Sequence, residues 1–104
     1  MGEVIVAPLE ELPPGAMRVV EHGHYRIGVF NCGGALLAIE DRCTHDDGPL
    51  CDGLWDTEDC TIVCPRHGAN FDLRSGRALS LPAYLPARTF PVAVRDGLVT
   101  VEVD

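Results

Sequence analysis

The sequence predicts an all-β fold, and three features of the 104-residue chain support this prediction. Eleven glycines and eight prolines place turns at short intervals along it. Between the turns stand short runs rich in β-branched and aromatic residues, which favour strands. No segment repeats its apolar residues with helical spacing over three turns. Many short strands separated by frequent turns indicate a sandwich or a barrel.

Eight runs are expected to form strands. They are residues 4–7, 16–20, 24–30, 35–39, 60–64, 70–73, 90–94 and 98–103. Tyr25, Ile27 and Val29 alternate with other residues, so they are expected to share one face of the third run. Gly33-Gly34 suits a tight hairpin between the third and fourth runs, and Asp96-Gly97 suits one between the last two.

Two segments, residues 41–53 and 64–69, are expected to be loops, and each carries one Cys and one His. The pairs are Cys43-Thr44-His45 and Cys64-Pro65-Arg66-His67. Two thiolates and two imidazoles suit either zinc or an iron–sulfur cluster. Structural zinc sites usually pair Cys with Cys and His with His, whereas each loop here supplies one of each. This arrangement favours a binuclear cluster in which two His replace two Cys on one iron. The alternatives are zinc at the same four ligands, or a buried or disulfide-bonded pair of Cys43 and Cys64 with His45 and His67 at the surface.

Further features around these pairs recur in a known family. They are Leu50, Gly68, Phe71, Asp72, Ser75-Gly76, Pro82 and the final Asp-Gly hairpin. Over nearly its whole length the chain resembles the Rieske ferredoxins, which are small electron carriers of bacterial ring-hydroxylating dioxygenase systems. The resemblance implies a Rieske iron–sulfur fold, in which three small antiparallel sheets form a sandwich. It implies a single domain over residues 1–104, with a cluster-binding hairpin subdomain at about residues 41–73.

The same resemblance implies one Rieske-type 2Fe–2S cluster, bound by Cys43, His45, Cys64 and His67, with residues 81–86 as a third loop over it. The protein would then be a one-electron carrier without catalytic residues. It would accept electrons from a flavin-dependent NAD(P)H reductase and pass them to a terminal oxygenase. The alternative is a small subunit or accessory electron-transfer protein of a larger oxidoreductase such as nitrite reductase. A redox sensor would be expected to bring a DNA-binding or effector domain.

Two differences from the respiratory Rieske proteins predict a low reduction potential. Those proteins carry a disulfide between the two loops, and its cysteines would fall at Gly48 and Arg66. They also place Ser and Tyr hydroxyls near the cluster, where this chain has Ala69 and Phe71. Because hydrogen bonds to the cluster sulfurs raise the potential, we expect a value near the low end of the Rieske range, about −150 mV. Phe71, together with Trp55, is expected to give apolar cover to the cluster.

Charge and hydropathy exclude several other functions. The net charge of −8 argues against nucleic-acid binding. No apolar stretch is long enough to span a membrane, and the N-terminus lacks signal-peptide features, so a cytoplasmic protein is expected. A monomer is the default expectation for its oligomeric state. Eight of the 16 acidic residues lie between residues 40 and 59, with only Arg42 to offset them, which also lowers the potential. The acidic run at residues 46–59 is either a solvated face or a docking surface for a basic patch.

Three cysteines and two histidines lie outside the ligand pattern. Cys32, Cys51 and Cys60 are expected to be packed or free thiols rather than a disulfide or a second metal site, since cytoplasmic thiols stay reduced. His22 and His24 are expected to lie in a solvated loop.

Overall fold

The fold is shown by a computed structural model, which describes residues 2–44, 48–66, 68–81, 83 and 85–103. Its elements are β1 (Gly2–Pro8), the 3-10 helix η1 (Leu9–Glu11), β2 (Met17–His22), β3 (Tyr25–Cys32), β4 (Ala35–Glu40), β5 (Trp55–Asp56), β6 (Thr61–Val63), β7 (Asn70–Asp72), β8 (Thr89–Phe90), β9 (Val92–Arg95) and β10 (Leu98–Val103). This confirms the predicted all-β fold. No helix in the described part of the chain is long and apolar enough to cross a membrane.

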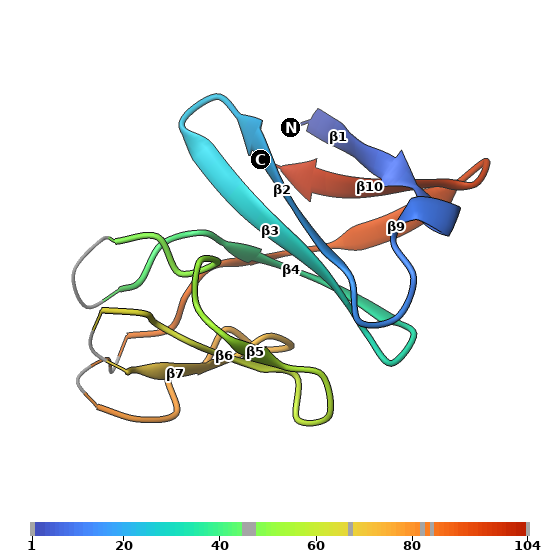
Figure 1. The fold of residues 1–104 in the computed structure, drawn as a ribbon. Helices are drawn as coiled ribbons and strands as arrows, with labels where there is room; N and C mark the ends of the chain where they lie inside the picture. The colour runs from blue at the N-terminus through green and yellow to red at the C-terminus, as the bar shows by residue number, and fades with distance from the viewer. Residues whose placement is uncertain (1, 45–47, 67, 82, 84, 104) are drawn as a thin grey trace.

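The strands form three antiparallel sheets, as expected from the resemblance (Figure 1). We call β1-β10-β9 the outer sheet, β2-β3-β4-β8 the central sheet and β5-β6-β7 the small sheet. One buried apolar cluster joins residues of the outer and central sheets, and a second joins residues of the central and small sheets. The central sheet is therefore the middle layer of a sandwich.

Strand β3 shows how the layers are held together. Ile27 and Val29 point to the first cluster, where they pack with Val101 of the outer sheet. Phe30 points the other way, into the second cluster with Phe71 of the small sheet. The predicted alternation is thus confirmed, but the opposite face is buried as well, because a second sheet covers it.

Both predicted hairpins are present. Cys32 pairs with Ala35 across Gly33-Gly34, and Arg95 pairs with Leu98 across Asp96-Gly97. Asp96 and Gly97 have φ angles of 52° and 77°, and two-residue hairpin turns of this kind require positive φ at both positions. The turn chemistry therefore sets the register of these strands.

The predicted strand at residues 90–94 is wrong as a single element. Before Pro91 the chain forms β8, which pairs with β4. After Pro91 it forms β9, which pairs with β10. Since proline has no N–H to donate, the ladder is interrupted there and the chain passes from the central to the outer sheet. Strand β5 was not predicted, because its two residues are too few to show any periodicity.

Candidate metal centre

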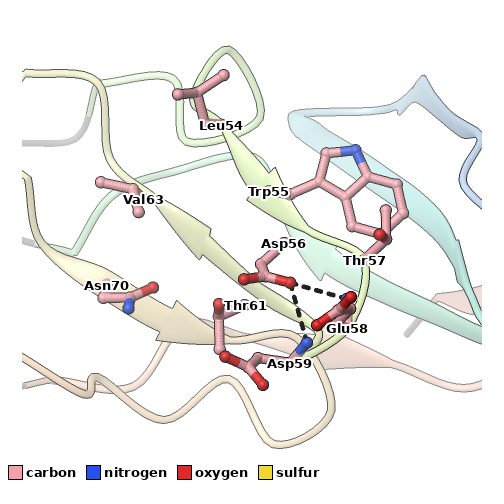
Figure 2. Close-up of a pocket in the computed structure, with 9 residues that line it drawn as sticks. All are labelled: Leu54, Trp55, Asp56, Thr57, Glu58, Asp59, Thr61, Val63 and Asn70. Carbon is pink, nitrogen blue, oxygen red and sulfur yellow. Dashed lines mark hydrogen bonds between the residues drawn. The ribbon is translucent and has the colours of Figure 1, made fainter.

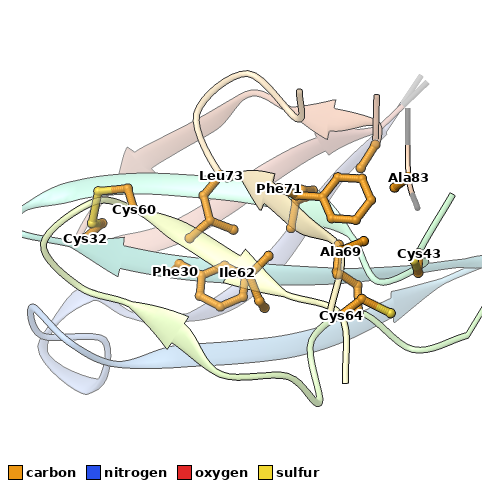
Figure 3. Packing of buried hydrophobic residues seen from close by; sticks show 13 residues of the cluster. Phe30, Cys32, Cys43, Cys60, Ile62, Cys64, Ala69, Phe71, Leu73 and Ala83 are labelled. Carbon is orange, nitrogen blue, oxygen red and sulfur yellow. A yellow bond between two sulfur atoms is a disulfide. The ribbon is translucent and has the colours of Figure 1, made fainter. Parts of the chain in front are cut away.

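The structure brings the two predicted cysteine ligands into one buried region. Cys43 follows β4, Cys64 follows β6, and neither is in a disulfide or has more than 1% of its surface exposed. They belong to the apolar cluster between the central and small sheets, which also contains Ala69 and Phe71. Figure 3 shows both cysteines at the same end of this cluster. The predicted ligands His45 and His67 lie outside the described residues.

The two cysteines begin turns that close in the same way. The N–H of Cys43 donates to the carbonyl oxygen of Gly48 at 2.8 Å, and the N–H of Cys64 donates to that of Ala69 at 2.7 Å. In the second turn the N–H of Gly68 also donates to the carbonyl oxygen of Cys64, with φ of 74° at Gly68. Such a left-handed conformation favours glycine. Each loop therefore folds back on itself directly after its cysteine.

A third segment approaches the first loop. The hydroxyl of Thr44 donates to the carbonyl oxygen of Leu85 at 2.7 Å, and Ala83 is buried in the same cluster as the two cysteines. Pro82 and Tyr84 of this segment lie outside the described residues. The described part of residues 81–86 thus lies beside the first cysteine loop, and its role as a cover over the iron–sulfur cluster stays a prediction.

The side chains at this end of the buried apolar cluster include thiols that suit an iron–sulfur group. Thiolate sulfur is the usual protein ligand of such clusters, and a buried thiolate needs a positive partner because desolvation penalises its charge. Within the ranges that the structure describes, no three His, Cys, Asp or Glu side chains are grouped to bind a metal ion. A metal held at Cys43 and Cys64 would therefore need further donors, which the sequence predicts to be His45 and His67. Ala69 and Phe71, both fully buried, present no hydroxyl there.

Cys51 is the third free cysteine among the described residues, as expected. Burial, followed by the negative charge of Asp41 and a hydrogen bond to it, raises the pKa of the Cys51 thiol well above its usual value. A thiol that keeps its proton is a poor metal ligand. His22 and His24 are both exposed, as expected, but only His24 lies in a turn, because His22 ends β2 and pairs with Tyr25.

Cys32 and Cys60 form a disulfide, with their Cα atoms 5.9 Å apart, so the prediction of free or packed thiols is wrong for both. Cys32 ends β3 and Cys60 precedes β6, 28 residues later in the sequence. They meet because the small sheet packs on the central sheet, and this contact has no local sequence signal. Figure 3 shows the disulfide at the opposite end of the buried cluster from Cys43 and Cys64.

The described part of the acidic run is exposed, and part of it borders a pocket of about 600 Å³ around β5 and β6 (Figure 2). Its described members are Asp52, Asp56, Glu58 and Asp59, whereas Asp46 and Asp47 lie outside the described residues. The backbone N–H groups of Asp59 and Glu58 donate to Oδ1 of Asp56 and lower the pKa of its carboxyl group. Trp55, beside this pocket, packs edge-on against Phe30, with ring centroids 5.0 Å apart.

Asp41 corrects the charge count made from the sequence. Its side chain is fully buried, and its Oδ2 accepts a hydrogen bond from Nε of Arg26 at 2.6 Å. Arg26 therefore offsets an acidic charge of this region in addition to Arg42. Sequence reasoning gave Asp41 no role, because its partner lies 15 residues away on β3.

Comparison with known proteins agrees with this geometry. The Rieske [2Fe-2S] domain model matches residues 2–91. The 3-phenylpropionate/cinnamic acid dioxygenase ferredoxin subunit of Photorhabdus laumondii is 40% identical over 103 residues, covering 99% of this chain and 96% of that protein. The ferredoxin of carbazole 1,9a-dioxygenase from Nocardioides aromaticivorans IC177 is similar in structure, with a TM-score of 0.89, 32% identity and 97% of each chain covered.

A second solved structure holds a ferredoxin together with its oxygenase, in carbazole 1,9a-dioxygenase. Its matching chain has a TM-score of 0.87 and 34% identity, over 95% of this chain and 91% of that one. The family match, the near full-length relatives and the three-sheet fold agree with one another. The chain belongs to the Rieske [2Fe-2S] domain family, as a ferredoxin that carries electrons rather than a catalytic subunit.

Proposed function

We propose that this ferredoxin holds one 2Fe–2S cluster through Cys43, His45, Cys64 and His67. The observation that carries the proposal is the burial of Cys43 and Cys64 in one apolar cluster, outside any disulfide and each at the start of a turn closed by its own N–H. The bound cluster supplies reversible uptake of one electron. The thiolates of Cys43 and Cys64 would hold one iron, and the imidazoles of His45 and His67 the other.

The cluster-binding part of the chain is proposed to be a subdomain at about residues 41–73 of a single domain over residues 1–104. Both cysteine loops and all three strands of the small sheet fall within these limits. The buried apolar residues that the small sheet shares with the central sheet support one continuous domain. In this arrangement the first loop follows β4 of the central sheet, and the second joins β6 and β7 of the small sheet.

We propose a flavin-dependent NAD(P)H reductase as electron donor and a terminal oxygenase as acceptor, with the carrier a cytoplasmic monomer. The ferredoxin–oxygenase complex among the similar structures and the dioxygenase names of the relatives support the acceptor. The surface next to Cys64 suits a transient contact, because Leu54, at 86% exposure, lines a pocket with Cys64 and Pro65. The exposed acidic residues of the β5–β6 region would steer a basic partner.

The test of this function is an electron paramagnetic resonance (EPR) spectrum before and after reduction, with a redox titration. We expect a silent oxidised protein and, after reduction, a rhombic signal of low average g. The midpoint is expected near the low end of the Rieske range, about −150 mV. A colourless protein with stoichiometric zinc would contradict the ligand assignment, and a midpoint above about +100 mV would contradict the low-potential assignment.

Adding hydroxyl groups at positions 69 and 71 is expected to raise the midpoint. Ala69→Ser and Phe71→Tyr would place donors in the buried cluster that contains both cysteines. A hydrogen bond to a charged group contributes about 1.5 kcal/mol, which is about 65 mV for one electron. The matched control is Phe71→Leu, which changes the packing but adds no donor. A rise of the same size in that variant would show that packing, not hydrogen bonding, sets the potential.

A further inference from the structure

We propose that Asp41 is a positioning residue for the first ligand loop, which we define as residues 42–50. Its carboxylate ties the far end of this loop to β3, while its own backbone holds the near end. The inference goes beyond electron carriage but rests on the proposed role of Cys43 as a ligand. It assigns a role to a buried acidic side chain that the proposed function does not otherwise use.

The near end of the loop is held by two hydrogen bonds between the same two residues. The backbone N–H of Asp41 donates to the carbonyl oxygen of Arg26 at 2.6 Å. Nε of Arg26 donates to Oδ2 of Asp41, also at 2.6 Å. Asp41 directly follows β4, so these bonds extend the contact between β3 and β4 into the start of the loop.

The far end of the loop is held by the other carboxylate oxygen. The backbone N–H of Cys51 donates to Oδ1 of Asp41 at 2.6 Å. The thiol of Cys51 also packs on β3 at Gly28, where an added Cβ would lie 2.3 Å from the sulfur. Residues 41 and 51 thus meet at the surface of β3, where the side chain of Asp41 joins the two ends of the loop.

The burial of Asp41 shows that these contacts are specific. Its side chain is 0% exposed, and a buried carboxylate is stable only with a charged partner and satisfied hydrogen bonds. Oδ2 accepts from Nε of Arg26 and Oδ1 accepts from the backbone N–H of Cys51, and the Cys51 thiol also hydrogen-bonds to this side chain. Replacing the carboxylate with an amide therefore removes the acceptor of at least one of these donors.

The hydrogen bonds of Asp41 enclose the segment that contains the proposed ligand Cys43. Cys43 lies two residues beyond Asp41, within the segment that the link closes. Groups behind a metal ligand fix its orientation, and their loss typically lowers metal affinity by 10–100-fold. By holding both ends of the loop to a buried strand, Asp41 would keep the Cys43 sulfur in one place as the cluster gains and loses an electron.

The experiment compares Asp41→Asn with Asp52→Asn in the cluster-bound protein. Asp52 is exposed, and its charge acts on both Arg26 and Cys51. Asp52→Asn therefore removes the same charge as Asp41→Asn but leaves the hydrogen bonds of Asp41 in place. An asparagine at position 41 presents one amide nitrogen, which faces a donor in either orientation. We expect Asp41→Asn to release the cluster to a chelator about tenfold faster, to broaden the EPR lines, and to exchange the Cys51 amide hydrogen about tenfold faster.

Asp52→Asn is expected to leave all three measurements unchanged. Equal cluster loss and equal Cys51 exchange in the two variants would overturn the proposal. If Asp41→Asn does not fold, Arg26→Gln removes one arm of the link and should change the same measurements in the same direction, and no change would again overturn it. If the unmodified protein binds no cluster, the ligand assignment fails, while exchange at Cys51 still tests the link.

Discussion

Replacing Cys64 with serine is expected to abolish cluster binding completely. The serine hydroxyl keeps its proton under conditions where a thiol can ionise, so it cannot replace the thiolate that iron requires. Cys43→Ser should give the same result, because Cys43 is buried in the same apolar cluster. Visible absorbance, iron and sulfide content and the EPR signal of the reduced protein measure the loss.

The matched control is Cys51→Ser, which makes the same atomic exchange at the remaining free cysteine of the described chain. Cys51 is held as a thiol against Gly28, and we expect its replacement to leave the cluster in place. Loss of the cluster in this variant and retention in Cys64→Ser would contradict the ligand assignment.

The histidine ligands have their own pair of controls. His45→Ala and His67→Ala are expected to lose the cluster, because each would remove one of the two nitrogen ligands of an iron. His22→Ala and His24→Ala should retain it, since both residues are exposed and lie near the β2–β3 turn. Retention in all four variants would indicate that the metal is held by another set of donors.

The sequence predicted those parts of the fold that depend on neighbouring residues. Asp96-Gly97 specifies its hairpin because both residues must take positive φ, and the two strands follow from that turn. The cysteine and histidine pattern is also local, since each loop carries its two donors within four residues. The structure then places Cys43 and Cys64 in one buried cluster, whereas ligation by the two histidines stays a prediction.

The parts that were missed depend on contacts between sheets. The pairing of Arg26 with Asp41 follows from the β3–β4 register, and the Cys32–Cys60 disulfide follows from the packing of the small sheet on the central sheet. Neither leaves a pattern in the chain, because the partners are 15 and 28 residues apart. The break at Pro91 was visible in the sequence, but the sheet that each half joins was not.

Removal of the Cys32–Cys60 disulfide is expected to lower the free energy of unfolding by about 3–4 kcal/mol, because a cross-link across 28 residues restricts the unfolded chain. The variant is Cys32→Ser with Cys60→Ser, measured by urea unfolding. Each single replacement should cost nearly as much as the double, since either one removes the whole bridge. Cys51→Ser, which removes a cysteine but no bridge, should change the unfolding free energy far less.

Removal of the disulfide should also destabilise some sheets more than others. The bridge joins the end of β3 to the turn before β6, so it ties the small sheet to the central one at the end opposite to Cys43 and Cys64. Cys60 has a φ of 57°, a conformation that costs about 1–2 kcal/mol for a residue with a side chain, and the bridge fixes it in place.

Without the bridge we expect amide exchange to quicken first at Ile62 and Phe71 of the small sheet, while Ile27 and Val101 keep their protection. Uniform quickening at all four amides would show instead that the disulfide acts only through the unfolded chain.

Thiol alkylation of the denatured protein, with and without prior reduction, checks the bridge itself. Three reactive thiols should rise to five on reduction, because Cys43, Cys51 and Cys64 are outside the disulfide that joins the other two. Five from the outset would mean that packing of the two sheets alone holds the small sheet in position.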